Sequence, residues 1–249
     1  RARFPVPVSV DRFSTEGHFD VIVRDIDLPQ ETADWVEQPA PTRPQRRWVD
    51  VSDGQLGLVV ANRGLPEVEV MRTVTGSEIA LTCLRCVGWL SRGDLAVRRG
   101  HAGPGLPTPE AQCMDEYTFH YALIPHDGDR RAAVDQAYAF AAPLRAVPTD
   151  VHAGTLGSVA SLIQVTSGSF MVSAVKEPED NEGLIVRFWN AGIDVCTAQV
   201  RFWQRPSGVM RCTLGERDLE ALPIAPDGSV SIEAGAKEIV TVRAEFESS

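Results

Sequence analysis

The sequence has very little lysine, few aromatic residues and no long apolar run. Lys176 and Lys237 are the only lysines among 249 residues, a bias toward arginine that we attribute to a GC-rich genome, and aromatic residues make up 7%. No run of about 18 apolar residues occurs, so we expect no membrane span. The net charge of −10 argues against nucleic acid as a partner, because phosphate binding needs a clustered cationic face.

Secretion signals and a disulfide pattern are also missing. The chain opens on Arg1 without methionine or a signal peptide, and it has no Asn-x-Ser/Thr glycosylation acceptor. Its five cysteines show no paired spacing, which favours a reducing compartment: Cys83, Cys86, Cys113, Cys196 and Cys212. We therefore expect a cytoplasmic protein, and we expect the Arg-Ala-Arg-Phe-Pro start to mark a truncation of a longer chain.

Motifs for common site chemistries are absent or weak. No nucleophile elbow occurs, and no Gly-rich phosphate loop leads from a strand into a helix. Cys83 and Cys86 have a zinc or redox spacing, but residues three apart in a strand point to opposite faces, so we predict buried structural cysteines. Asp50-Val-Ser-Asp53-Gly54 lacks a closing carboxylate for calcium, and a hairpin turn explains it.

Carboxylates cluster near one loop, yet the sequence alone singles out no catalytic pair. A glycosidase of the usual type needs two carboxyl groups flanking the bond that it cleaves. Asp94, Glu110, Asp115 and Glu116 are available, and we interpret Asp115 and Glu116 as surface residues. The role of Glu110 is left open.

Strand signals dominate what is present. Short apolar segments alternate with Gly-, Pro- and Asp-rich turns at a spacing typical of β-sandwiches. The predicted strands are 17–28, 48–51, 56–60, 68–74, 78–90, 117–124, 170–176, 184–189, 198–203, 209–214 and 238–246. The sequence therefore predicts an all-β fold, with a large antiparallel sandwich over residues 1–147, a linker or crossover over 148–168 and a smaller Ig-like sandwich over 169–249.

One segment has helical character. Residues 130–142 are rich in alanine, follow Asp127-Gly128-Asp129 as a capping region and are stopped by Pro143. The same segment also fits an extended arm with Tyr138 and Phe140 packed inward, and both alternatives stay open.

The segment 92–112 is too rich in Gly and Pro for regular structure and too long for a simple connection, which runs to about 4–6 residues. Such loops commonly serve contact or binding. Arg92, Arg98 and Arg99, with Gln112, form a plausible lining for an anionic or hydroxyl-rich ligand, and glycine-flanked His101 is a further contact candidate. A solvated loop or a salt-bridged domain interface explains these residues equally well.

Several blocks of the sequence, taken together, resemble the C-terminal β region of glycoside hydrolase family 38, especially its bacterial α-mannosidase-like and mannosylglycerate-hydrolase-like members. The blocks are Arg47-Trp-Val-Asp-Val-Ser-Asp-Gly54, Gly57-Leu-Val-Val-Ala-Asn-Arg-Gly64, Leu84-Arg-Cys-Val-Gly-Trp-Leu-Ser-Arg92, His101-Ala-Gly-Pro104 and Phe119-His-Tyr-Ala-Leu-Ile-Pro-His126, with 172–180 and 183–190 further on. The resemblance covers most of the chain.

The resemblance implies a retaining α-mannosidase whose nucleophile and zinc ligands lie in an N-terminal α/β barrel, followed by a helical bundle and then β-sandwich domains. No position here matches those residues, so it implies no catalytic residue and no bound metal in this chain, with zinc expected in the missing catalytic domain. The implied partners are that barrel, in the same polypeptide, and a mannose-containing carbohydrate. The isolated chain is expected to be inactive.

In this family a loop of the large β domain can approach the sugar site. The resemblance therefore makes Arg92, Arg98, His101 and Gln112 candidates for the rim of that site. Two alternatives belong to other classes of protein. A stand-alone carbohydrate-binding module would expose Trp189 and Trp203 as a coplanar pair, and a purely structural module would dock through an apolar patch.

Overall fold

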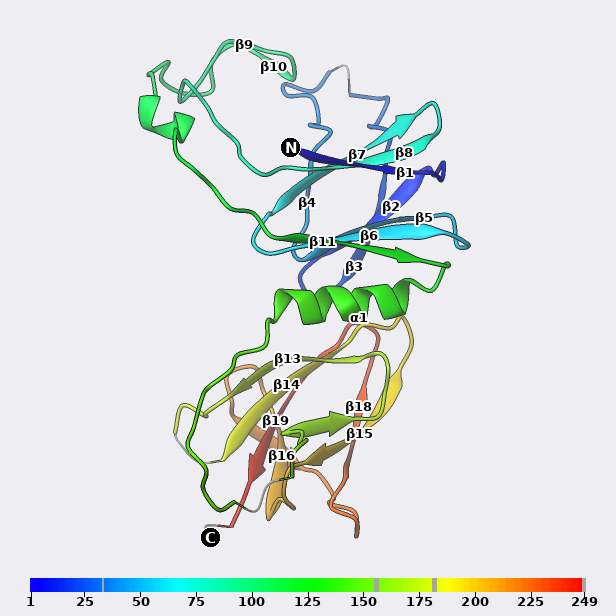
Figure 1. Cartoon of the computed structure of the whole chain (residues 1–249), viewed down its shortest axis with the longest axis vertical. Coiled ribbons are helices and arrows are strands. Elements are labelled where there is room, and N and C mark those ends of the chain that lie inside the picture. Colours follow the sequence, from blue (N-terminus) through cyan, green and yellow to red (C-terminus); the bar gives the residue numbers. More distant parts are fainter. Residues whose placement is uncertain (33, 155–156, 181–182, 248–249) are drawn as a thin grey trace. The chain divides into compact units, whose positions relative to one another are not determined.

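The computed structural model describes residues 1–32, 34–154, 157–180 and 183–247 (Figure 1). It divides into two compact units, Arg1–Ala146 and Val147–Ser249. The described elements are almost entirely strands in antiparallel sheets, which confirms the predicted all-β class. No helix in this described part of the chain has the length and apolar character to cross a membrane.

The first unit is built on two antiparallel sheets. One sheet has the order β1-β8-β7-β4, with β1 Ala2–Val6, β8 Gly76–Leu81, β7 Glu67–Thr73 and β4 Arg43–Pro44. The other has the order β11-β6-β5-β2-β3, with β11 Tyr121–His126, β6 Gly57–Asn62, β5 Trp48–Ser52, β2 Arg12–Glu16 and β3 Val21–Asp25. Buried side chains of both sheets share one core, as the inner faces of a sandwich do.

The second sheet of this unit is covered on its other face by the helix α1, Arg130–Ala141. Because side chains alternate along a strand, β5 turns Val49 toward the core between the sheets and Trp48 toward the helix. Ala133 and Ala137 are fully buried there and let the helix lie close to the sheet. The Asp129 carboxylate accepts a hydrogen bond from the Arg131 N–H and caps the first turn. Of the two alternatives for this segment, the helix is the one observed.

The second unit also packs two antiparallel sheets around one core. One has the order β12-β15-β18, with β12 Ile163–Val165, β15 Cys196–Phe202 and β18 Val230–Ala234. The other has the order β13-β14-β19-β16-β17, with β13 Phe170–Lys176, β14 Leu184–Asn190, β19 Ile239–Glu245, β16 Gly208–Cys212 and β17 Asp218–Ala221. The segment 148–168 was predicted as a linker or crossover. It contains the strand β12, whose backbone pairs with β15.

The hairpin of β5 and β6 forms where the sequence predicts it. Ser52 pairs with Gly57 at the end of the ladder, and the Asp53 carboxylate accepts hydrogen bonds from the N–H groups of Gln55 and Leu56, both at 2.9 Å. Gly54 adopts a φ of 87°, which glycine tolerates without strain. The predicted strand 78–90, by contrast, is correct only as far as Leu81. β8 ends at Leu81, and the apolar residues beyond it lie in an exposed loop.

A side-chain amide holds one end of the second unit together. Asn190, fully buried at the end of β14, donates through Nδ2 to the carbonyl oxygens of Asp194 (2.7 Å), Gly235 (2.9 Å) and Ala234 (3.3 Å). Its Oδ1 accepts from the Gly192 N–H at 2.9 Å. This single side chain therefore ties the turn after β14 to the end of β18.

Asp227, in the turn before β18, makes the stability of this unit sensitive to acid. Its carboxylate accepts hydrogen bonds from the Ser229 hydroxyl (2.7 Å) and the Ser229 backbone N–H (3.1 Å), and it pairs with Arg201. The hydrogen bonds from Ser229, and after them the pairing with Arg201, lower the pKa of Asp227 to about 2. A depressed pKa in the folded state stabilises the fold above the unfolded value of 3.8, and this contribution is lost as the pH falls toward 2.

We therefore expect Asp227→Asn to be less stable than the parent chain above pH 4, with the difference shrinking as the pH falls from 4 to 2. Urea unfolding at a series of pH values measures this difference. A difference that stays constant across that range would show that the Asp227 charge does not stabilise the fold.

Candidate functional site

The long connection between β8 and β11, which we call the 82–120 loop, carries the candidate site. It holds only short elements: β9 Asp94–Leu95, β10 Arg98–Arg99 and the 3₁₀ turn η1 Pro109–Gln112 (Figure 1). Backbone hydrogen bonds fold the loop back on itself, with the Leu90 N–H donating to the Leu106 carbonyl (2.8 Å) and the Thr108 N–H to the Gly88 carbonyl (2.9 Å). The loop is thus held in shape by its own backbone.

Apolar side chains of this loop face solvent. Trp89 is 48% exposed and Met114 is 92% exposed. The other exposed large apolar residues of the loop are Leu84, Val87, Leu90, Leu95, Leu106 and Tyr117. The concentration of exposed apolar side chains on one loop makes it a candidate interaction surface.

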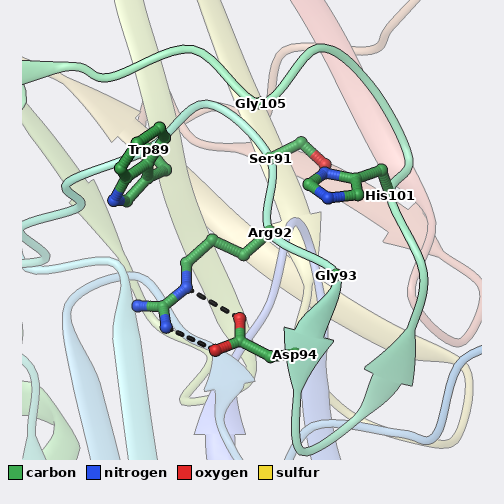
Figure 2. A pocket seen from close by; sticks show the side chains of 7 residues that line it. All are labelled: Trp89, Ser91, Arg92, Gly93, Asp94, His101 and Gly105. Carbon is green, nitrogen blue, oxygen red and sulfur yellow. Dashed lines mark hydrogen bonds and ion pairs between the residues drawn. The ribbon is translucent and has the colours of Figure 1, made fainter.

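A hollow of about 490 Å³ opens within the loop and lies in the size range of small-molecule sites (Figure 2). Its lining combines one aromatic ring, from Trp89, with four polar side chains, from Ser91, Arg92, Asp94 and His101. Ser91 links two segments of the loop that line the hollow, because its Oγ accepts hydrogen bonds from the N–H groups of Ala102 (3.1 Å) and Gly103 (3.3 Å).

Glycines leave room for the His101 ring in this hollow. A Cβ atom on Gly93 would lie 3.1 Å from the ring, and one on Gly105 would lie 3.3 Å from it. The ring is therefore packed between two backbone segments that carry no side chain. This packing restricts its orientation although the residue is exposed.

Arg92 and Asp94 form a bidentate ion pair in the same hollow (Figure 2). Arg92 Nε donates to Asp94 Oδ1 at 2.8 Å and Nη2 donates to Oδ2 at 2.6 Å. The hydrogen bonds raise the pKa of Arg92 and lower that of Asp94, so both groups stay charged at neutral pH. The pair is neutral as a unit and still offers guanidinium N–H donors and carboxylate lone pairs, a combination that suits hydroxyl groups.

The structure separates the four predicted rim residues. Arg92 and His101 line the hollow, whereas Arg98 and Gln112 do not. The Arg98 side chain is only 15% exposed and approaches Glu37, with 3.9 Å between Nη1 and Oε2. Gln112 ends the turn η1 beside Gly88. The functional roles of all four stay predictions.

Sequence reasoning missed Trp89 as a lining residue because it placed this tryptophan in the predicted strand 78–90. The same error affects the cysteines. Cys83 and Cys86 lie in the loop rather than in a strand, Cys86 is exposed, and both are free thiols, so the prediction of buried structural cysteines is wrong for Cys86. Among the residues that the structure describes, no group of three or more His, Cys, Asp or Glu side chains converges on a metal position.

The tryptophans of the second unit do not form the exposed pair that a binding module would present. Trp189 is only 6% exposed. Trp203 is 46% exposed, and its ring lies 4.2 Å from the Phe246 ring, measured between centroids. The polar hollow of the 82–120 loop therefore remains the better candidate site.

The fold and the hollow define an all-β protein region that presents a polar, aromatic-edged pocket on a long loop. Comparison with known proteins identifies this region. Residues 169–242 match the model of the glycosyl hydrolases family 38 C-terminal beta sandwich domain. Over 98% of its length the chain is 30% identical to a putative mannosylglycerate hydrolase of Halalkalibacterium halodurans, of which it covers 25%.

Solved structures agree with this assignment. An alpha-mannosidase from Enterococcus faecalis is 28% identical, with a TM-score of 0.74 over 98% of this chain and 25% of that one. A second glycosyl hydrolase family 38 protein from the same organism is 27% identical, with a TM-score of 0.74 over 98% of this chain and 26% of its own. These matches support the assignment of the chain to the C-terminal β region of glycoside hydrolase family 38. It spans about a quarter of the length of the curated relative that it matches.

Proposed function

We propose that this chain is the C-terminal part of a glycosidase that hydrolyses α-mannosides, and that its 82–120 loop forms part of the rim of the sugar site. The family match supports the class of enzyme, and the names of the relatives support mannose-containing substrates. The observation that carries the role of the loop is the hollow lined by Trp89, the Arg92–Asp94 pair and His101.

The chemistry of the hollow fits a sugar. Each sugar hydroxyl can donate and accept, and the Arg92–Asp94 pair supplies donors and acceptors side by side. The exposed Trp89 ring offers an apolar face for the C–H groups of a pyranose. Because the pair neutralises itself, it binds a neutral hydroxyl group without leaving an unpaired charge.

The exposed apolar residues of the same loop support a docking role beside the binding role. In this proposal they contact the N-terminal catalytic barrel of the same polypeptide, which brings the hollow to the edge of the catalytic centre. The nucleophile and the zinc are assigned to that barrel. The described residues here do not fit a zinc site, so we assign no step of the reaction to a metal held by this chain. The five free cysteines support a cytoplasmic location.

The test compares this 249-residue chain with the full-length polypeptide in an aryl α-mannoside assay with added zinc. We expect turnover by the long form and none by the 249-residue chain, because the chain supplies the rim but not the nucleophile. Clear turnover by the chain alone would overturn the proposal, and so would an inactive full-length protein that is folded and loaded with zinc.

A further inference from the structure

A second polar hollow lies in the first unit, apart from the 82–120 loop. It has a volume of about 290 Å³ and opens where β2, β5 and the turn between β11 and α1 meet. Its polar lining comes from Arg12, Ser14, Asp50, Ser52 and Arg130. None of these residues belongs to the site proposed above.

A buried carboxylate forms one wall of this hollow. The Asp50 side chain is 4% exposed, and its Oδ1 lies 2.9 Å from Nε2 of the equally buried His126. This hydrogen bond to the His126 ring engages Oδ1 of the Asp50 carboxyl group. The second oxygen, Oδ2, lies 3.8 Å from Arg130 Nη1, which is within ion-pair range but too long for a hydrogen bond.

The two serines are engaged only as acceptors. Ser14 Oγ accepts from Arg130 Nη1 at 2.6 Å, and Ser52 Oγ accepts from the Gly54 N–H at 3.1 Å. Within the described residues, neither hydroxyl proton has an acceptor, and Asp50 Oδ2 has no hydrogen-bond donor. The hollow therefore presents two hydroxyl donors beside one carboxylate acceptor, with Arg130 as an additional donor.

Two turns in contact with each other form part of the wall of this second hollow. Gly128, with a φ of 96°, approaches the hairpin turn so closely that a Cβ atom there would lie 2.2 Å from the Gly54 carbonyl oxygen. Glycine is therefore required where the turn before α1 meets the turn between β5 and β6. This contact places Arg130 opposite Ser52 and Asp50, which come from a distant part of the chain.

The charges of the hollow select against ions. A bound anion would face the buried carboxylate of Asp50, and a bound cation would face Arg12 and Arg130. Arg12 is partly neutralised by Asp25, with 3.0 Å between Nε and Oδ1. Adjacent donors and an acceptor are what a neutral vicinal diol requires, because each of its hydroxyl groups donates and accepts.

We propose that this hollow is a binding site for a small neutral polyol, no larger than a single sugar ring. The volume lies at the lower end of small-molecule sites, which limits the ligand to that size. This site is independent of the proposed glycosidase function, because it uses none of the residues of the 82–120 loop.

The test is a titration of the ¹⁵N-labelled 249-residue chain with erythritol and with methyl α-glucoside. The amide chemical shifts are measured at each ligand concentration. We expect saturable shifts in the neighbourhood of Ser14, Ser52, Gly54 and Gly128, counted separately from any shifts of the 82–120 loop. Sodium phosphate and sodium acetate serve as anionic probes and should leave these amides unshifted at equal ionic strength.

Variants separate this site from the rim. Ser14→Ala removes a hydroxyl donor and Arg130→Gln removes the guanidinium group, and each should weaken polyol binding in this hollow about tenfold. Arg92→Met alters only the hollow of the loop and should leave the shifts of Ser14, Ser52, Gly54 and Gly128 unchanged. The spectrum of each variant reports whether it is folded. The proposal is overturned if no polyol shifts these amides, if phosphate shifts them and the polyols do not, or if folded Ser14→Ala and Arg130→Gln bind as the parent chain does.

Discussion

Replacing Arg92 with methionine in the full-length enzyme is expected to lower kcat/KM for an aryl α-mannoside about 10- to 100-fold. A hydrogen bond from a charged group contributes about 1.5–3 kcal/mol. A loss of 1.4 kcal/mol corresponds to a tenfold change in rate or affinity. Arg92 and Asp94 are both exposed, so the substitution leaves no buried charge and should not destabilise the fold. Steady-state kinetics on the purified variant measure the effect.

Two residues of the same loop provide matched controls. Arg98→Met removes the same charge and Gln112→Ala removes a polar side chain, but neither residue lines the hollow. We expect both to retain kcat/KM within about twofold of the parent enzyme, whereas His101→Ala should lower it as Arg92→Met does. Equal losses in Arg92→Met and Arg98→Met would show that the loop acts through its overall charge rather than through the hollow.

The largest effect on stability is expected for Asn190→Asp, which should lower the free energy of unfolding by about 3–5 kcal/mol, the range for an uncompensated buried charge. The substitution keeps the shape of the side chain, but it places a carboxylate oxygen against the carbonyl groups that now accept from Nδ2, the shortest of these bonds being 2.7 Å to Asp194. Chemical unfolding of the 249-residue chain at pH 7 measures the loss.

Gln199→Glu is the matched control, because it makes the same amide-to-acid change at an exposed position on β15. We expect its stability to lie within about 0.5 kcal/mol of the parent, as for most surface substitutions. Burial raises the pKa of an aspartate at position 190, so the defect should shrink as the pH is lowered. If Asn190→Asp were as stable as Gln199→Glu at pH 7, the amide would not hold this end of the sandwich.

Local signals predicted much of the fold. The Asp53-Gly54 pair indicated the hairpin of β5 and β6, and the predicted strand 170–176 coincides with β13. The prediction of a strand over residues 78–90 failed beyond Leu81 for a physical reason. An apolar run without alternation is expected both of a strand buried on two faces and of a loop that presents apolar side chains for contact, and one sequence does not distinguish them.

The candidate site could be predicted only in part. Glycine and proline content located the loop, and Arg92 and His101 were picked out by residue type and flanking glycines. The pairing of Arg92 with Asp94 depends on the local course of the backbone, which composition does not specify. The second hollow was beyond sequence reasoning, because Ser14 and Arg130 are 116 residues apart in the chain and meet only after the strands have paired.

The 82–120 loop leaves the sandwich from β8 in one sheet and returns to β11 in the other. Each of these strands is held in register by its own partners, β8 by β1 and β7, and β11 by β6. Insertions, deletions and substitutions between these anchors therefore need not disturb either ladder. Evolution can change the lining of the hollow, and under the proposed function the sugar that it accepts, while the framework that carries it stays the same.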